Sequence, residues 1–103
     1  MGLSTHVLDT ALGQPAAEVR VRLERGEPTA GWTLLAEAVT DPDSRITGLP
    51  LTAPGRFRLV FDTSARSAFF PEVTIAFEVS DPADPHHVPL LLAPFGYSTY
   101  LGS

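Results

Sequence analysis

The 103-residue sequence contains no cysteine, and charged residues make up only 18% of it. The absence of cysteine excludes disulfides, thiolate catalysis and cysteine-ligated zinc sites. Hydrophobic residues amount to 44%, so the chain should fold, but a charge content this low predicts that other subunits cover part of its surface. We therefore expect residues 1–103 to form one small domain that associates through its surface.

Basic character and long apolar segments are missing as well. The net charge of −5 argues against nucleic acid and anionic membrane surfaces as partners. No stretch approaches the roughly 20 apolar residues of a membrane span, and the start MGLSTHVLDT lacks the basic region of an export signal. These features predict a soluble, cytoplasmic protein with no nucleic-acid or membrane partner.

Proline and glycine, in contrast, are plentiful. Ten prolines and eight glycines are spread along the chain, where they would break most long helices. Short runs rich in Val, Leu, Phe and Thr lie between them, a pattern typical of all-β proteins. The expected strands are 4–10, 18–25, 31–39, 45–47, 56–63, 71–81, 86–92 and 96–102. About eight strands suit two packed four-stranded sheets.

Alternation of apolar and polar residues supports several of these strands. In 18–25 the apolar face carries Val19, Val21 and Leu23, and 56–63 alternates in the same way. Segment 31–39 also fits helical spacing, although its flanking turns favour a strand, and 64–70 has room for at most one helical turn. Pro89 cannot donate a ladder hydrogen bond, so its strand must be bulged there or lie at a sheet edge.

Few residues could carry chemistry, and the sequence holds no GxGxxG, P-loop, HExxH or GxSxG motif. His86 and His87 are adjacent in a predicted strand, so their rings should point to opposite faces and make a poor metal site. A lone histidine among apolar residues, such as His6, is more often structural than catalytic. Arg45 follows a tight turn, where a solvated charge is the ordinary interpretation, and Ser103 is a chain terminus.

Four segments, taken together, favour a functional role for these histidines, Arg45 and Ser103 instead. STHVLDTALGQPA, TDPDSRITGL, FFPEV and HHVPLLLAPFGYSTYLGS resemble the 5-hydroxyisourate hydrolases, the transthyretin-related enzymes of urate breakdown. The resemblance implies an all-β, transthyretin-like two-sheet sandwich that assembles as a homotetramer, a dimer of dimers. It also implies an active site in a channel at the dimer–dimer interface. The reaction would open the ring of 5-hydroxyisourate to 2-oxo-4-hydroxy-4-carboxy-5-ureidoimidazoline, with no metal or cofactor.

The resemblance also assigns site residues. The implied catalytic residues are His6, Arg45, His87 and Ser103, and the implied substrate-binding residues are Arg45, Tyr100, Leu101 and Gly102. Leu101 stands where the family has arginine, Ser44 stands where glycine is common, and 64–70 is shorter than the helix-bearing segment of the family. These departures spare the two histidines and the arginine.

The implied chemistry is attack of water on a ring carbonyl. His6 and His87 would share the roles of base and acid, with either assignment open, because histidine titrates near neutral pH. Arg45 would hold the amide-like edge of the substrate and stabilise the oxyanion. One alternative is a non-catalytic small-ligand carrier on the same scaffold, favoured only by Leu101. Another is an interaction domain of an adhesive surface protein, disfavoured by the single-domain length and the missing signal peptide.

Overall fold

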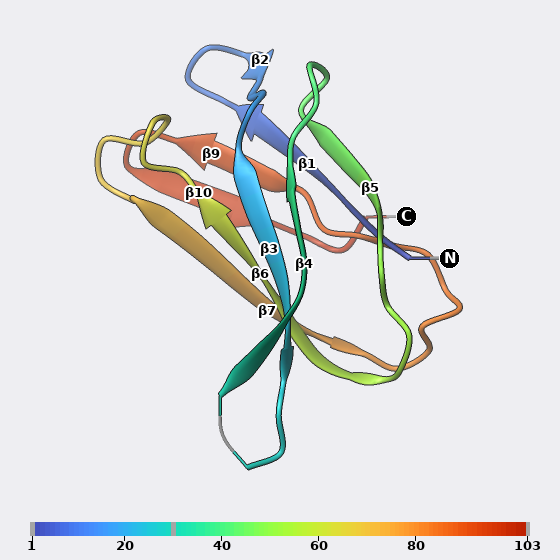
Figure 1. The fold of residues 1–103 in the computed structure, drawn as a ribbon. Helices are drawn as coiled ribbons and strands as arrows, with labels where there is room; N and C mark the ends of the chain where they lie inside the picture. The colour runs from blue at the N-terminus through green and yellow to red at the C-terminus, as the bar shows by residue number, and fades with distance from the viewer. Residues whose placement is uncertain (1, 30, 103) are drawn as a thin grey trace.

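Two β-sheets make up nearly all of the regular structure in the computed structural model, which describes residues 2–29 and 31–102 (Figure 1). The strands are β1 (Leu3–Asp9), β2 (Gln14–Pro15), β3 (Arg20–Gly26), β4 (Trp32–Val39), β5 (Arg45–Leu49), β6 (Gly55–Asp62), β7 (Glu72–Val79), β8 (His86–His87), β9 (Leu90–Ala93) and β10 (Gly96–Thr99). The described residues form no helix, and hence none that could cross a membrane. The predicted all-β sandwich is confirmed.

The four-stranded sheet has the order β4-β3-β6-β7, and all its pairs are antiparallel. The predicted strand at 31–39 is β4, so its helical interpretation is wrong. Alternation places Val21, Leu23 and the other predicted inward residues of β3 and β6 in the core. Figure 1 shows the β3–β4 hairpin extending beyond the rest of the molecule.

The second sheet is built around β1. Strands β8 and β9 run parallel to β1, β2 and β5 pair with it in antiparallel fashion, and β10 forms an edge beside β9. Segments from the start, middle and end of the chain therefore meet on β1 (Figure 1). This convergence is what positions the candidate site.

Pro89 divides the predicted strand 86–92 into two pieces, β8 and β9. The predicted interruption is confirmed, since proline has no N–H to donate to the ladder. The edge alternative is wrong, because β9 lies between β1 and β10. The structure has ten strands instead of eight for two reasons. One predicted strand is divided at Pro89, and the two-residue β2 lies within a predicted turn.

Between β6 and β7 the chain makes a hydrogen-bonded turn and no helix, within the expected limit of at most one helical turn. The N–H of Ser67 donates to the carbonyl oxygen of Thr63 at 2.9 Å, four residues back. The Ser67 hydroxyl donates to the carbonyl oxygen of Pro94, also at 2.9 Å. The turn is thereby attached to the loop between β9 and β10.

The core lies between the two sheets. Its fully buried large side chains are Leu3, Val7, Val21, Leu23, Phe57, Leu59, Phe61, Val73, Leu90 and Leu92. The buried Thr5 hydroxyl donates to the carbonyl oxygen of Val88 at 2.6 Å, so no polar group of Thr5 is left unsatisfied in the core. This bond joins β1 to the residues beside Pro89 and fixes the two strands that carry the histidines.

Candidate active site

The pairing of β1 with its neighbours brings His6, Arg45 and His87 together. The buried residues of β1 alternate with Ser4 and His6, which are only half-buried and therefore belong to the outer face of the sheet. His6 is the direct partner of Arg45 in β5, and Ser4 is the direct partner of His87 in β8. Directly opposed residues project from the same face, so all four side chains share it.

A tight turn before β5 fixes the backbone of Arg45. The Asp41 carboxylate accepts hydrogen bonds from the N–H groups of Asp43 and Arg45, both at 2.9 Å. Ser44 lies between them in the left-handed region, with φ of 62°. Its carbonyl oxygen accepts a 3.0 Å hydrogen bond from the N–H of Val7, which ties the turn to β1 beside His6.

Arg45 keeps its charge available. Its side chain is exposed, and the ion pairs formed within residues 2–29 and 31–102 all involve other arginines. A guanidinium without a carboxylate partner retains its planar set of N–H donors for a ligand. The position therefore suits recognition of two neighbouring acceptors on a flat molecule.

The surroundings of His6 lower the pKa of its imidazole below the ordinary value of 6.5. Burial is the largest cause, and the charge of Arg45 and the neighbouring His87 act in the same direction. A hydrogen bond with the Asp43 backbone and the charge of Asp41 oppose the shift but do not outweigh it. This environment favours the neutral form of His6, which can accept a proton.

His87 is held on two sides. Its Nδ1 atom lies 2.8 Å from the hydroxyl oxygen of Ser4, within hydrogen-bond distance. Its carbonyl oxygen accepts a 2.7 Å hydrogen bond from the N–H of Gly102. A Cβ atom at residue 102 would lie only 2.8 Å from Cδ2 of the ring, so glycine is needed there. This contact places Gly102 directly beside His87.

A hollow of about 510 Å³ opens beside these residues, with Ser4, Arg45, Thr47 and His87 in its wall. His6 is not part of that wall in a single chain, although its partner Arg45 is. The hollow is large enough for a small planar molecule, and its wall supplies a cation, an imidazole and hydroxyl groups.

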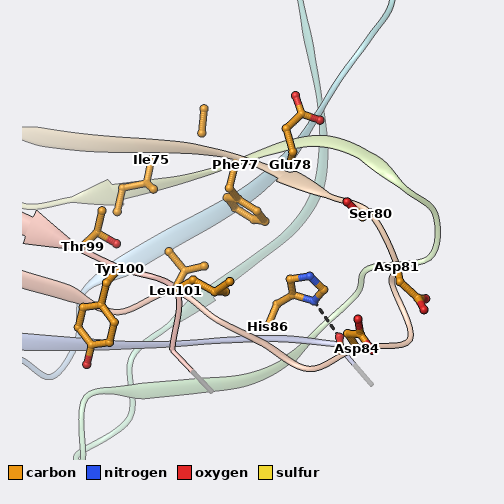
Figure 2. A pocket seen from close by; sticks show the side chains of 12 residues that line it. Ile75, Phe77, Glu78, Ser80, Asp81, Asp84, His86, Thr99, Tyr100 and Leu101 are labelled. Atoms are coloured by element: carbon orange, nitrogen blue, oxygen red, sulfur yellow. Dashed lines mark hydrogen bonds between the residues drawn. The ribbon is translucent and has the colours of Figure 1, made fainter.

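A second hollow, of about 390 Å³, lies at the edge formed by β7 and the end of the chain (Figure 2). Phe77, His86, Tyr100 and Leu101 line it, and Nδ1 of His86 donates to the carbonyl oxygen of Asp84 at 2.8 Å. His86 pairs with the buried Leu3 and His87 with the half-buried Ser4, so the two residues project from opposite faces of the strand, which confirms the prediction. His86 also contributes to the wall of the first hollow.

Within one chain, the structure does not bring Tyr100 and Leu101 together with His6 and Arg45, because both line the second hollow. The predicted strand 96–102 ends at Thr99, and the residues after it leave the sheet before Gly102 bridges to His87. Ser103 lies outside the described residues.

Sequence reasoning missed Ser4. Its spacing from His6 places both on one face of a strand, and this much is readable from the sequence. Its contact with His87 joins positions 83 residues apart and depends on the parallel pairing of β1 with β8. No pattern in the sequence indicates that pairing.

Comparisons with known proteins identify the family of this chain. The HIUase/Transthyretin family pattern matches residues 3–102. The 5-hydroxyisourate hydrolase of Salmonella typhimurium is 43% identical over 110 residues, which span 98% of this chain and 80% of that protein. The chain belongs to the HIUase/Transthyretin family.

Two solved structures show the same fold. The 5-hydroxyisourate hydrolase of Klebsiella pneumoniae is 38% identical with a TM-score of 0.82, and the match covers 100% of both chains. Sea bream transthyretin, solved in complex with thyroxine, is 28% identical with a TM-score of 0.89 and is matched over 99% of this chain and 95% of its own. The family thus includes both enzymes and a thyroxine-binding protein.

Proposed function

We propose that this protein hydrolyses 5-hydroxyisourate, opening its six-membered ring to 2-oxo-4-hydroxy-4-carboxy-5-ureidoimidazoline in urate breakdown. The observation that carries the proposal is the meeting of His6, Arg45 and His87 on the outer face of one sheet through direct strand pairing. Relatives named 5-hydroxyisourate hydrolase support it at about 40% identity over nearly the whole chain.

Arg45 binds the substrate in this mechanism. The substrate is small, flat and rich in carbonyl groups, and a planar guanidinium matches two neighbouring acceptors. When water adds to the ring carbonyl, negative charge develops on its oxygen, and Arg45 stabilises that charge. The contribution of one such donor is worth about 3–4 kcal/mol of transition-state stabilisation.

His6 activates the water. Because the pKa of His6 is lowered, mainly by burial and then by Arg45, its imidazole is neutral and can take a proton from the attacking water. The resulting imidazolium then gives that proton to the ring nitrogen as the carbon–nitrogen bond breaks. One water is consumed, and the histidine returns to its starting state. Ser103 is proposed to order the water, as the family resemblance implies.

We further propose that the active protein is a homotetramer, a dimer of dimers. Strands β7 and β10 are the edge strands on the same side of the two sheets and are free to pair with a second copy. Phe95 and Leu101, near β10, are 76% and 72% exposed, which is unusual for large apolar residues. Tyr100 and Leu101 would act on the substrate only in such an assembly.

The carrier alternative is supported in the described residues by Leu101 alone. Thyroxine binding is a property of the transthyretin relative, and Leu101 remains the one feature that favoured a carrier. His6, Arg45 and His87 keep a geometry suited to hydrolysis, and a carrier has no use for it.

The decay of freshly made substrate tests the proposal through its ultraviolet absorbance. The protein should accelerate the decay above the spontaneous rate, and His6→Ala or His87→Ala should lower kcat by about 10²–10⁴. Arg56→Ala is the control, because its exposed ion pair with Glu78 lies on the four-stranded sheet, away from these residues, and it should leave the rate within about twofold. Decay no faster than in buffer would refute the proposal.

A further inference from the structure

In the hydrogen bond between Ser4 and His87, it matters for the chemistry which of the two side chains is the donor. A neutral imidazole carries its proton on one nitrogen and a lone pair on the other. Whichever role Nδ1 plays toward the Ser4 hydroxyl, 2.8 Å away, Nε2 must play the opposite one. The contact therefore decides what His87 offers to a ligand.

The Ser4 hydroxyl has one proton to donate. Among the residues that the structure describes, Nδ1 of His87 is the only hydrogen-bond partner of its oxygen. A half-buried hydroxyl beside an imidazole nitrogen is best satisfied when it donates to that lone pair, because otherwise its proton has no protein acceptor. Donation leaves the proton of the neutral ring on Nε2.

We propose that Ser4 is a positioning residue, whose hydroxyl donates to Nδ1 of His87 and holds this ring as the neutral tautomer with a proton on Nε2. The inference deepens the proposed function and rests on it. It assigns His87 as a hydrogen-bond donor to the reacting carbonyl or ring nitrogen and leaves the role of base to His6.

Other contacts fix the ring once the tautomer is set. The N–H of Val88 donates to the carbonyl oxygen of Ser4 at 3.0 Å, so the backbones of β1 and the following residues keep the two side chains in register. Gly102 lies against the opposite edge of the ring, where a Cβ would be 2.8 Å from Cδ2. Nε2 has no protein partner within the described residues and is free for substrate.

The two histidines therefore differ in what they present. The surroundings of His6 favour its neutral ring, mainly through burial and then through the charge of Arg45, so this ring can accept a proton. His87 presents an N–H instead. The proton removed from water passes to His6 and then to the leaving ring nitrogen, while His87 donates a hydrogen bond throughout and loses no proton. No further acid or oxidant is needed.

Nitrogen-15 NMR of the whole protein at about pH 8, where an ordinary histidine is neutral, measures the tautomer directly. We expect His87, assigned by comparison with His87→Gln, to show a protonated Nε2 and a bare Nδ1. Ser4→Ala should give a mixture of both tautomers, and Ser4→Thr, which keeps the hydroxyl, should restore the wild-type spectrum. A protonated Nδ1 in the wild-type protein would overturn the proposal.

Kinetics provide the second readout. Ser4→Ala should lower kcat about tenfold with a smaller change in KM, as when hydrogen-bond partners of other functional histidines are removed, and Ser4→Thr should recover most of it. The control is Ser64→Ala, which removes a 2.7 Å side-chain hydrogen bond to Asp62 away from the site and should change neither quantity. An unchanged tautomer and kcat in Ser4→Ala would refute the inference.

These outcomes separate the inference from the proposed function. A wild-type protein that shows the Nε2 tautomer but does not accelerate substrate decay would refute the hydrolase proposal and leave the role of Ser4 toward His87 intact. An active protein in which Nδ1 of His87 is protonated would refute the proposed role of Ser4 and leave the hydrolase proposal intact.

Discussion

The arginines on the outer faces of the two sheets differ in their partners. On the four-stranded sheet, Nε of Arg58 lies 2.6 Å from a carboxylate oxygen of Glu24, and its guanidinium lies 4.3 Å from the ring centroid of Trp32. On the sheet built around β1, the described residues give Arg45 no carboxylate partner, and its nearest strand neighbour is His6.

This difference separates structural charge from functional charge. An arginine between a carboxylate and an indole ring has used its donors and its flat face on the protein itself. An arginine beside a neutral imidazole keeps both for a ligand. The contrast supports placing the proposed chemistry on the β1 sheet, and the following variants test that placement.

The largest effect is expected for Arg45→Gln. Removing the unpaired guanidinium should lower kcat by about 10²–10³ and change the free energy of unfolding by no more than about 0.5 kcal/mol. Arg20→Gln on the other sheet, which removes an exposed contact of 3.9 Å to Glu37, is the matched control and should keep full activity. Initial rates and urea denaturation measure both. Similar losses of activity in the two variants would remove the contrast.

Gly102→Ala should have the next largest effect. The new methyl group would lie 2.8 Å from Cδ2 of His87 and must displace the ring, which should reduce kcat about 10- to 100-fold. Gly96→Ala is the control, because no heavy atom lies within 4 Å of its added Cβ and its backbone is not left-handed. The hydrolysis rate measures both, and a normal rate in Gly102→Ala would show that the position of this ring is unimportant.

The pH dependence should follow His6. Because burial and then Arg45 lower its pKa, kcat/KM should fall with decreasing pH only below 6.5. NMR titration of His6 in Arg45→Gln should show a higher pKa, since one of the depressing charges is gone. The unfolded chain binds this proton at higher pH than the folded one, so stability should also decline as the pH falls below about 6.5. A His6 pKa at or above 6.5 in the wild-type protein would contradict this.

Ser44 should show the smallest effect. This buried residue precedes Arg45 with φ of 62°, a conformation that glycine adopts without strain. The free energy of unfolding of Ser44→Gly should therefore exceed that of Ser44→Ala by about 0.5–1 kcal/mol, with activity unchanged in Ser44→Gly. Denaturant titration of the pair measures the difference. Equal stability would mean that the turn holds Arg45 without strain.

Local pattern predicted more of the fold than of the site. Alternation identified the buried faces of β3 and β6 because a strand repeats every two residues, and Pro89 predicted the interruption that separates β8 from β9. The two-residue β2 is too short to leave a pattern.

Contacts across the sequence were harder to anticipate. His6, Arg45 and His87 were found through family resemblance, while their meeting depends on the pairing of β1 with β5 and β8, which no local signal encodes. Tyr100 and Leu101 were assigned to the substrate, but they line the hollow of Figure 2 in a single chain because the last strand ends at Thr99. Their contribution to substrate binding stays a prediction about the assembled protein.

A crystal structure of the protein with a stable, planar purine analogue tests most directly where the chemistry occurs. We predict that the analogue binds on the outer face of β1, with the Arg45 guanidinium about 3 Å from two of its acceptors and both His6 and His87 beside its ring. Binding only in the hollow lined by Phe77 and His86 would contradict the account.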